Sequence, residues 1–160
     1  MSWKKSARAL DFGNKNDYIN TVMAANSRFA VATHLLAALA NARPGEPQCS
    51  KYLASSVNTH PVVVRRIMAD LVKAGLVEAV PGKLGGFLLA KPATRVSLWD
   101  VMQAVDEAKV FAFNPNPANP DCPVSVSMAK ALRPVFNQVQ SSVEAVLRGQ
   151  RVQDLVQQLG

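Results

Sequence analysis

Residues 49–89 read CSKYLASSVNTHPVVVRRIMADLVKAGLVEAVPGKLGGFLL, and this stretch decides the fold. It predicts two helices followed by a two-stranded hairpin. Ser50 is suited to cap the first helix, because its hydroxyl can accept a hydrogen bond from an early helical N–H. Asn58 and Thr59 are expected to end that helix and to cap the next one. Pro61 fits the first turn of the second helix, where its missing N–H would be unpaired in any case.

The second helix of this stretch has two different faces. Apolar residues at positions i, i+3, i+4 and i+7 predict a buried stripe of Val64, Ile67, Met68 and Leu71. The opposite side carries Val62, Arg65, Arg66, Ala69 and Lys73. Gly75 is expected to end the helix, because glycine tolerates a left-handed turn.

A hairpin is predicted directly after this helix. Residues 76–80 form a short strand, residues 81–86 a turn and residues 87–89 the return strand. Helix, tight turn, helix and hairpin is the order of a winged helix-turn-helix, in which the second helix enters the major groove of DNA. We therefore predict a mainly α fold with a two-stranded β wing. The alternative is an ordinary solvated helix face beside a hairpin.

Composition places the chain among globular proteins. Its 160 residues are 49% hydrophobic and 18% charged, which fits one domain with a sizeable core. The net charge of +7 favours an acidic partner. Residues 26–90 carry seven Lys and Arg against three Asp and Glu, whereas residues 91–160 carry seven against six. The excess therefore lies in the half that holds the helix and hairpin pattern.

Neither a membrane span nor a signal peptide is predicted. The longest apolar run, residues 29–40, is too short to cross a bilayer. The first residues contain charges but no apolar segment of the kind a signal peptide needs. We therefore expect a cytoplasmic protein with no membrane partner.

Three parts are predicted along the chain. Residues 1–25 lack periodicity and are interpreted as an N-terminal extension. Residues 26–92 form the winged helix-turn-helix DNA-binding domain, and residues 93–160 form a linker and dimerisation helices. Asn26 or Ser27 is expected to cap the first helix of the domain. The core face of that helix is predicted to consist of Ala32, Leu35, Leu36 and Leu39.

The C-terminal part predicts a homodimer. Ser97 should cap a helix over residues 98–107, and residues 110–123, with four prolines, should form a loop. Apolar residues then repeat at helical spacing over residues 124–148. So long a helix beyond a small domain favours a partner surface, which a second copy supplies. Such a dimer presents two recognition helices to the half-sites of a palindromic operator. The alternative is that the helix packs back on its own domain.

The chain has two cysteines, Cys49 and Cys122, and no CxxC motif. Two thiols cannot fill an iron–sulfur or structural zinc site unaided, so no metal or cofactor is predicted. Cys122 directly precedes the long helix, whose N-terminus favours anions, and oxidants attack the thiolate form of cysteine. Cys122 is therefore a candidate redox thiol. The alternative is a small half-buried residue without a sensing role.

The chain resembles the Rrf-two family of bacterial winged helix-turn-helix regulators, which includes IscR, NsrR and CymR. The resemblance spans about residues 23–160 and is carried by segments 27–32, 58–66, 71–77, 85–90 and 97–101. It implies DNA binding and dimerisation. Cluster-binding members carry three closely spaced cysteines after the fourth helix, whereas this segment holds only Cys122. The chain thus resembles the cluster-free subgroup, and the effector is left open.

The sequence predicts a sequence-specific DNA-binding transcriptional regulator, a homodimeric repressor with a possible thiol response, rather than an enzyme. No GxGxxG, P-loop, HExxH or nucleophile-elbow motif is present. Arg65 is the expected base contact, because its fork can grip guanine. The full set of predicted DNA-binding residues is Arg28, Ser50, Thr59, His60, Val62, Arg65, Arg66, Lys83 and Gly85. The alternative is a winged-helix protein-interaction module that does not touch DNA.

Overall fold

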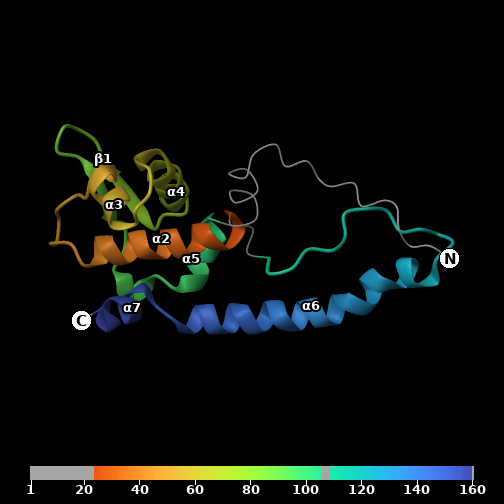
Figure 1. Cartoon of the computed structure of the whole chain (residues 1–160). Helices are drawn as coiled ribbons and strands as arrows, with labels where there is room; N and C mark the ends of the chain where they lie inside the picture. Colours follow the sequence, from red (N-terminus) through yellow and green to blue (C-terminus); the bar gives the residue numbers. More distant parts are fainter. Residues whose placement is uncertain (1–23, 106–108, 160) are drawn as a thin grey trace.

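The computed structural model describes residues 24–105 and 109–159 (Figure 1). In chain order the elements are α2 (Ala24–Ala40), α3 (Ser50–Ser56), α4 (Pro61–Lys73), β1 (Val77–Val80), β2 (Gly86–Leu89), the short 3-10 helix η1 (Ala93–Arg95), α5 (Leu98–Val105), α6 (Pro123–Gly149) and α7 (Val152–Gln158). In Figure 1, α3, α4 and the hairpin lie on one side of α2, whereas α5 and α7 lie on the other. The predicted winged helix-turn-helix order is confirmed.

The start of α3 differs from the prediction by one residue. Cys49 is the N-cap, and its Sγ accepts a hydrogen bond from the N–H of Tyr52 at 3.5 Å. Ser50 is already the first helical residue, so its prediction as the cap is wrong. A thiol and a hydroxyl stand next to each other here, and the spacing of the apolar residues alone does not select between them.

The start of α4 is also displaced from the prediction. His60 is the N-cap, and its Nδ1 accepts a hydrogen bond from the N–H of Val62 at 3.2 Å. The prediction that Asn58 or Thr59 caps this helix is therefore wrong. Asn58 instead forms the turn between α3 and α4 with a φ of 49°, a left-handed conformation that asparagine tolerates better than most residues.

The core buries the two helix stripes that the sequence predicts. These are Ala32, Leu35, Leu36 and Leu39 on α2 and Val64, Ile67, Met68 and Leu71 on α4. The prediction that α2 is capped at Asn26 or Ser27 is wrong, because this helix already includes Ala24. The core also continues beyond residue 92 and takes in Ala93, Val96, Leu98, Val101, Val105 and Val152. Therefore η1, α5 and α7 pack on the same core as the helix-turn-helix.

The wing is anchored to the loop before α3. Strands β1 and β2 pair antiparallel, with Val80 opposite Gly86. Gln48 forms a further bridge with Phe87 through two backbone hydrogen bonds of 3.0 Å. A Cβ on Gly85 would collide with the carbonyl of Val80, and one on Gly86 with the carbonyl of Gln48. Glycine is therefore needed at both positions for the hairpin to close against this loop.

Ser97 caps α5 as predicted. The N–H of Asp100 donates to Ser97 Oγ at 3.1 Å, and the N–H of Ser97 donates to Asp100 Oδ2 at 3.0 Å. Burial raises the pKa of Asp100, but hydrogen bonds from Ser97 and the positive charges of Lys91 and Arg148 outweigh it, so the pKa lies below the ordinary value of 3.8. The carboxylate of Asp100 is thus held in its charged form.

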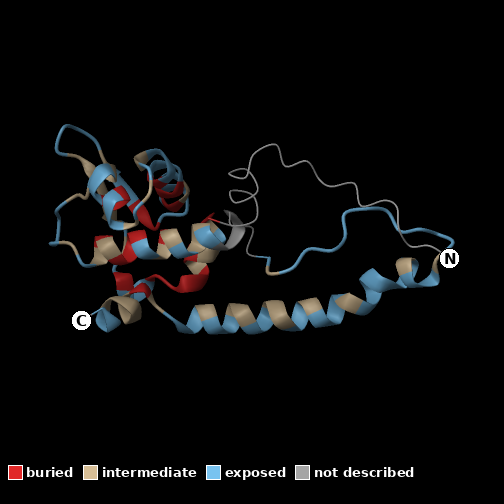
Figure 2. Ribbon diagram, viewed as in Figure 1, coloured by how far each residue is buried: buried red, intermediate tan, exposed pale blue. Residues whose placement is uncertain are grey.

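Helix α6 carries an apolar stripe that the described part of the chain covers only in part. None of its 27 residues is buried, and Figure 2 shows it extending from the red core with only intermediate and exposed positions. Its C-terminal end is held where Leu147 packs on the core and the guanidinium of Arg148 lies 5.5 Å from the Trp99 ring. The large apolar residues that are 46–65% exposed are Val124, Val126, Met128, Val135 and Val146.

Residues 109–122 form the predicted irregular loop, which runs alongside α6 in Figure 1. The rings of Phe111 and Phe113 lie 5.1 and 5.0 Å from the ring of Phe136 on α6. Pro134 lies inside the helix and does not mark its start. Across residues 24–105 and 109–159, every helix is too short or too polar to cross a membrane.

Candidate nucleic-acid interface

The outer face of α4 gathers the cationic residues that the sequence assigns to DNA binding. Arg65 and Arg66 are exposed, opposite the buried stripe, and Val62 is 39% exposed one turn earlier. Within the residues that the structure describes, neither arginine forms an ion pair. This face can therefore approach an anionic surface without breaking an internal contact.

His60 places a hydrogen-bond donor at the N-terminus of α4. Its Nδ1 accepts the capping hydrogen bond from Val62, so the neutral ring carries its proton on Nε2. The side chain is exposed, and Thr59 beside it is half-buried. A helix N-terminus favours anions, because its first N–H groups and the helix dipole point outward. The capping arrangement thus suits His60 to a phosphate oxygen.

The tip of the wing presents Lys83 and Leu84. Lys83 is exposed and Leu84 is 90% exposed, whereas Gly85 is half-buried beneath them. Gly82 takes a φ of 109° at the start of the turn, a conformation that only glycine adopts readily. Figure 1 shows this turn projecting on the same side of α2 as α3 and α4. The wing can therefore reach the surface that α4 meets.

The first turn of α3 adds two residues that the sequence reasoning missed. Lys51 is exposed and Tyr52 is 57% exposed, whereas the predicted contact Ser50 is half-buried. Lys51 forms no ion pair with any described residue. Its place one residue after Ser50, in the first turn of a helix-turn-helix, is the signal that could have identified it.

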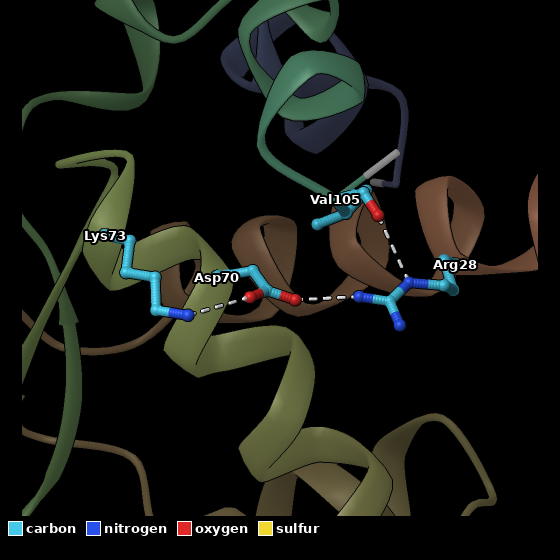
Figure 3. Close-up of polar contacts among 4 residues, drawn as sticks. All are labelled: Arg28, Asp70, Lys73 and Val105. Carbon is cyan, nitrogen blue, oxygen red and sulfur yellow. Dashed lines mark hydrogen bonds and ion pairs between the residues drawn. The ribbon is translucent and has the colours of Figure 1, made fainter. Parts of the chain in front are cut away.

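Arg28 is placed apart from the other predicted DNA contacts. Its Nη2 donates to Asp70 Oδ2 at 2.7 Å, and its Nε donates to the carbonyl of Val105 at 3.2 Å (Figure 3). These contacts join α2, α4 and α5. The geometry therefore engages the Arg28 side chain within the fold, and its role as a DNA contact stays a prediction.

The cysteines do not form a metal-binding set. Cys49 is the exposed N-cap of α3, whereas Cys122 is the half-buried N-cap of α6. Figure 1 shows α3 and the start of α6 at opposite ends of the molecule. Within residues 24–105 and 109–159, no three His, Cys, Asp or Glu side chains gather closely enough to hold a metal ion. Since iron–sulfur clusters need several thiolate ligands, the donor set of the described chain does not fit one.

Fold and interface together define a winged helix-turn-helix transcriptional regulator. The Rrf2 family model, described as "Iron-dependent Transcriptional regulator", matches residues 25–158. The chain belongs to this family.

Three relatives illustrate the similarity. YwnA of Bacillus subtilis, named as an HTH-type transcriptional regulator, is 38% identical over 135 residues, which cover 84% of this chain and 98% of YwnA. The structure of T. potens IscR matches with a TM-score of 0.63 and 22% identity, over 84% of this chain and 86% of that one. The oxidized form of Staphylococcus aureus CymR matches with a TM-score of 0.63 and 20% identity, over 81% and 93% of the two chains.

Proposed function

We propose that the protein is a sequence-specific DNA-binding repressor that acts as a homodimer. The observation that carries the proposal is the composition of α4, whose inner side is buried in the core while its outer side presents unpaired arginines. The family supports it, since its model describes transcriptional regulators. Helix α4 is then the recognition helix, which lies in the major groove with the wing against the DNA backbone.

The residues that the sequence predicts on this interface have chemical roles in the proposal. Arg65 donates two hydrogen bonds to guanine O6 and N7, and Val62 contacts a thymine methyl group. His60 and Arg66 bind phosphates beside the recognition helix, and Lys83 does so from the wing. Thr59, Ser50 and Gly85 flank these positions and allow the backbone to approach the DNA.

A homodimer would cover the apolar surface of α6 that its own chain leaves exposed. At about 1.5 Å per residue the helix is about 40 Å long, so two copies can pack along a large fraction of that length. Val139 and Val143 are half-buried by their own chain and lie one turn apart. A two-fold axis through this pair sets two recognition helices on two half-sites of one operator. A dimer seated across a promoter blocks polymerase, which is the basis for proposing repression.

The test is binding to the duplex DNA upstream of the protein's own gene. The proposal predicts steeply salt-dependent affinity, because phosphate contacts release counterions, together with two chains per bound duplex. Expression of a reporter from that DNA should fall when the protein is supplied. A protein that binds all duplexes equally weakly, or that ignores salt, would instead favour the alternative of a protein-interaction module.

A thiol response at Cys122 is a second part of the proposal. Cys122 precedes α6 directly, and its side chain makes no capping hydrogen bond, so the sulfur is not held in place by the helix. Attack of its thiolate on hydrogen peroxide gives a sulfenic acid and hydroxide. The structural neighbour CymR has been solved in an oxidized form, which supports testing the idea. Mild peroxide should weaken DNA binding by the wild type but not by Cys122→Ser; equal loss in both excludes Cys122.

A further inference from the structure

Arg28 connects three helices that are far apart in the sequence. It lies on α2, 42 residues before Asp70 of the recognition helix α4 and 77 residues before Val105, the last residue of α5. Figure 3 shows the guanidinium between the two acceptors, with one nitrogen directed at each. Only arginine can make both contacts at once, because its fork carries several N–H donors at fixed angles.

We propose that Arg28 is a positioning residue that fixes the recognition helix α4 relative to α5. The inference rests on the proposed function, since it concerns how well α4 fits DNA. The two charged side chains are partly shielded from solvent, with Arg28 and Asp70 38% and 31% exposed, and Val105 is buried. Lys73 also approaches Asp70, but at 3.7 Å and with its own side chain 80% exposed, so Arg28 is the stronger partner.

The contact with Val105 joins α2 to α5. Arg28 Nε donates a hydrogen bond to the backbone carbonyl of Val105 at 3.2 Å. Val105 is itself buried in the core, so this contact depends on the last described turn of α5 keeping its place beside α2.

The contact with Asp70 acts on the DNA-reading face. Asp70 lies one turn after Arg66 on α4, so a shift of the carboxylate moves the arginines with it. A bidentate contact to a base demands close alignment, and small displacements of the helix reduce it. Arg28 thus adds a polar link between α5 and the recognition helix to the direct packing of these two helices.

A direct DNA contact by Arg28 makes the opposite predictions. If Arg28 bound a phosphate, Arg28→Ala would make the salt dependence of binding shallower by about one ion. Asp70→Asn would then free the arginine, remove a negative charge near the DNA, and leave affinity unchanged or higher. If Arg28 positions α4, both substitutions weaken operator binding and neither changes the salt slope.

The first experiment measures operator affinity by fluorescence anisotropy across a salt series. Arg28→Ala, Asp70→Asn and the double variant should each weaken binding by about tenfold, because the two residues act as one unit and their effects do not add. Arg28→Lys should recover part of the loss, since one ammonium can reach Asp70 but cannot also hold Val105. Glu144→Gln, which breaks the 2.8 Å ion pair with Arg148 on α6, is the matched control and should leave affinity unchanged.

The second experiment does not depend on DNA. In Asp70→Asn the amides of the last turn of α5 should exchange hydrogen faster than in the wild type, although Asp70 has no hydrogen bond to α5 within the described residues. Lys73→Ala, which removes the 3.7 Å contact to the same carboxylate, should leave that turn unchanged. Unchanged α5 exchange in Asp70→Asn overturns the inference whether or not the protein binds DNA. If Asp70→Asn shows the exchange effect but the wild type binds no operator, the link between α4 and α5 through Arg28 stands and only the proposed function is removed.

Discussion

Apolar helix stripes are buried in the globular part of the chain but not in helix α6. In the globular part, the stripes of α2 and α4 face each other and are closed by α5, η1 and α7. In α6 a comparable periodicity continues over 27 residues, yet none of them is buried. The same helical pattern thus has two meanings, an internal core in one region and an interface in the other. Neighbouring elements make this difference. The described chain buries the stripes of α2 and α4 in the core but covers that of α6 only in part.

The largest effect on operator binding is expected from substitutions in the proposed dimer interface on α6. Val139→Glu or Val143→Glu should give a monomer that has lost tight operator binding, because burying an unpaired charge costs about 3–5 kcal/mol and a two-fold dimer carries it twice. Sedimentation velocity and anisotropy with operator DNA measure both properties. Ser141→Glu adds the same charge to an exposed position of α6 and should remain dimeric. A wild type that is monomeric at micromolar concentration would contradict the account of α6.

A core substitution should affect folding rather than assembly. Leu36 is fully buried, so Leu36→Ala should lower the free energy of unfolding by about 2–5 kcal/mol through lost burial and the cavity it leaves. Leu84, which is 90% exposed at the wing tip, provides the control, and Leu84→Ala should change stability by less than about 0.5 kcal/mol. Urea unfolding measures both. Equal losses of unfolding free energy in the two variants would contradict the assignment of Leu36 to the core.

Replacing Arg65 should weaken DNA binding without lowering the stability of the fold. Arg65→Ala should weaken operator binding by about 1–3 kcal/mol and relax specificity at one position in each half-site. Its melting temperature should match the wild type, because the side chain is exposed and has no ion pair within the described residues. Competition with operator variants measures the specificity. Unchanged affinity and unchanged base preference would remove Arg65 from the interface.

Stability at low pH should depend on Asp100. Because its pKa is lowered in the folded protein, its stabilising contribution is present above the unfolded-state pKa of about 3.9 and is lost as pH falls through the folded-state value. Asp100→Asn should therefore be less stable than the wild type at pH 6, and the difference should shrink as the pH falls through the folded-state pKa of Asp100. Thermal melts between pH 2.5 and 7 measure it.

The smallest effect is expected at the wing. Lys83→Ala should weaken binding to all duplexes alike and make the salt slope shallower by about one, since one phosphate contact is lost. The control is Lys91→Ala, a half-buried position after the wing. A loss confined to particular sequences would show instead that the wing reads bases.

The sequence predicted those parts of the fold that depend on local order. The stripe of α4, its end at Gly75 and the turn before β2 follow from periodicity and from glycine conformation, and all three are present, Gly75 with a φ of 67°. The caps of α2, α3 and α4 were missed by one residue or more, since adjacent polar side chains compete for the same N–H groups, whereas the Ser97 cap of α5 was predicted correctly. Periodicity also predicted α6, but the stripe does not itself say what covers it.

For the candidate site, the sequence predicted the exposed cationic residues of α4 and the wing but missed the internal contacts of Arg28. Arg65, Arg66 and Lys83 are exposed as the helix pattern requires. Arg28 was predicted as a DNA contact, but its acceptors lie 42 and 77 residues away, so only the packing of three helices shows that its charge is already engaged. Lys51 was not among the predicted contacts, although it lies one residue after Ser50.

A footprint of the full-length protein on the DNA upstream of its gene tests the central claim, that two recognition helices read one operator, most directly. The account predicts two symmetric protected tracts with centres about 34–36 Å, or one DNA turn, apart, and two chains on each duplex. In Arg65→Ala the protection should weaken equally in both tracts. A single protected tract bound by one chain, or uniform protection without boundaries, would contradict it.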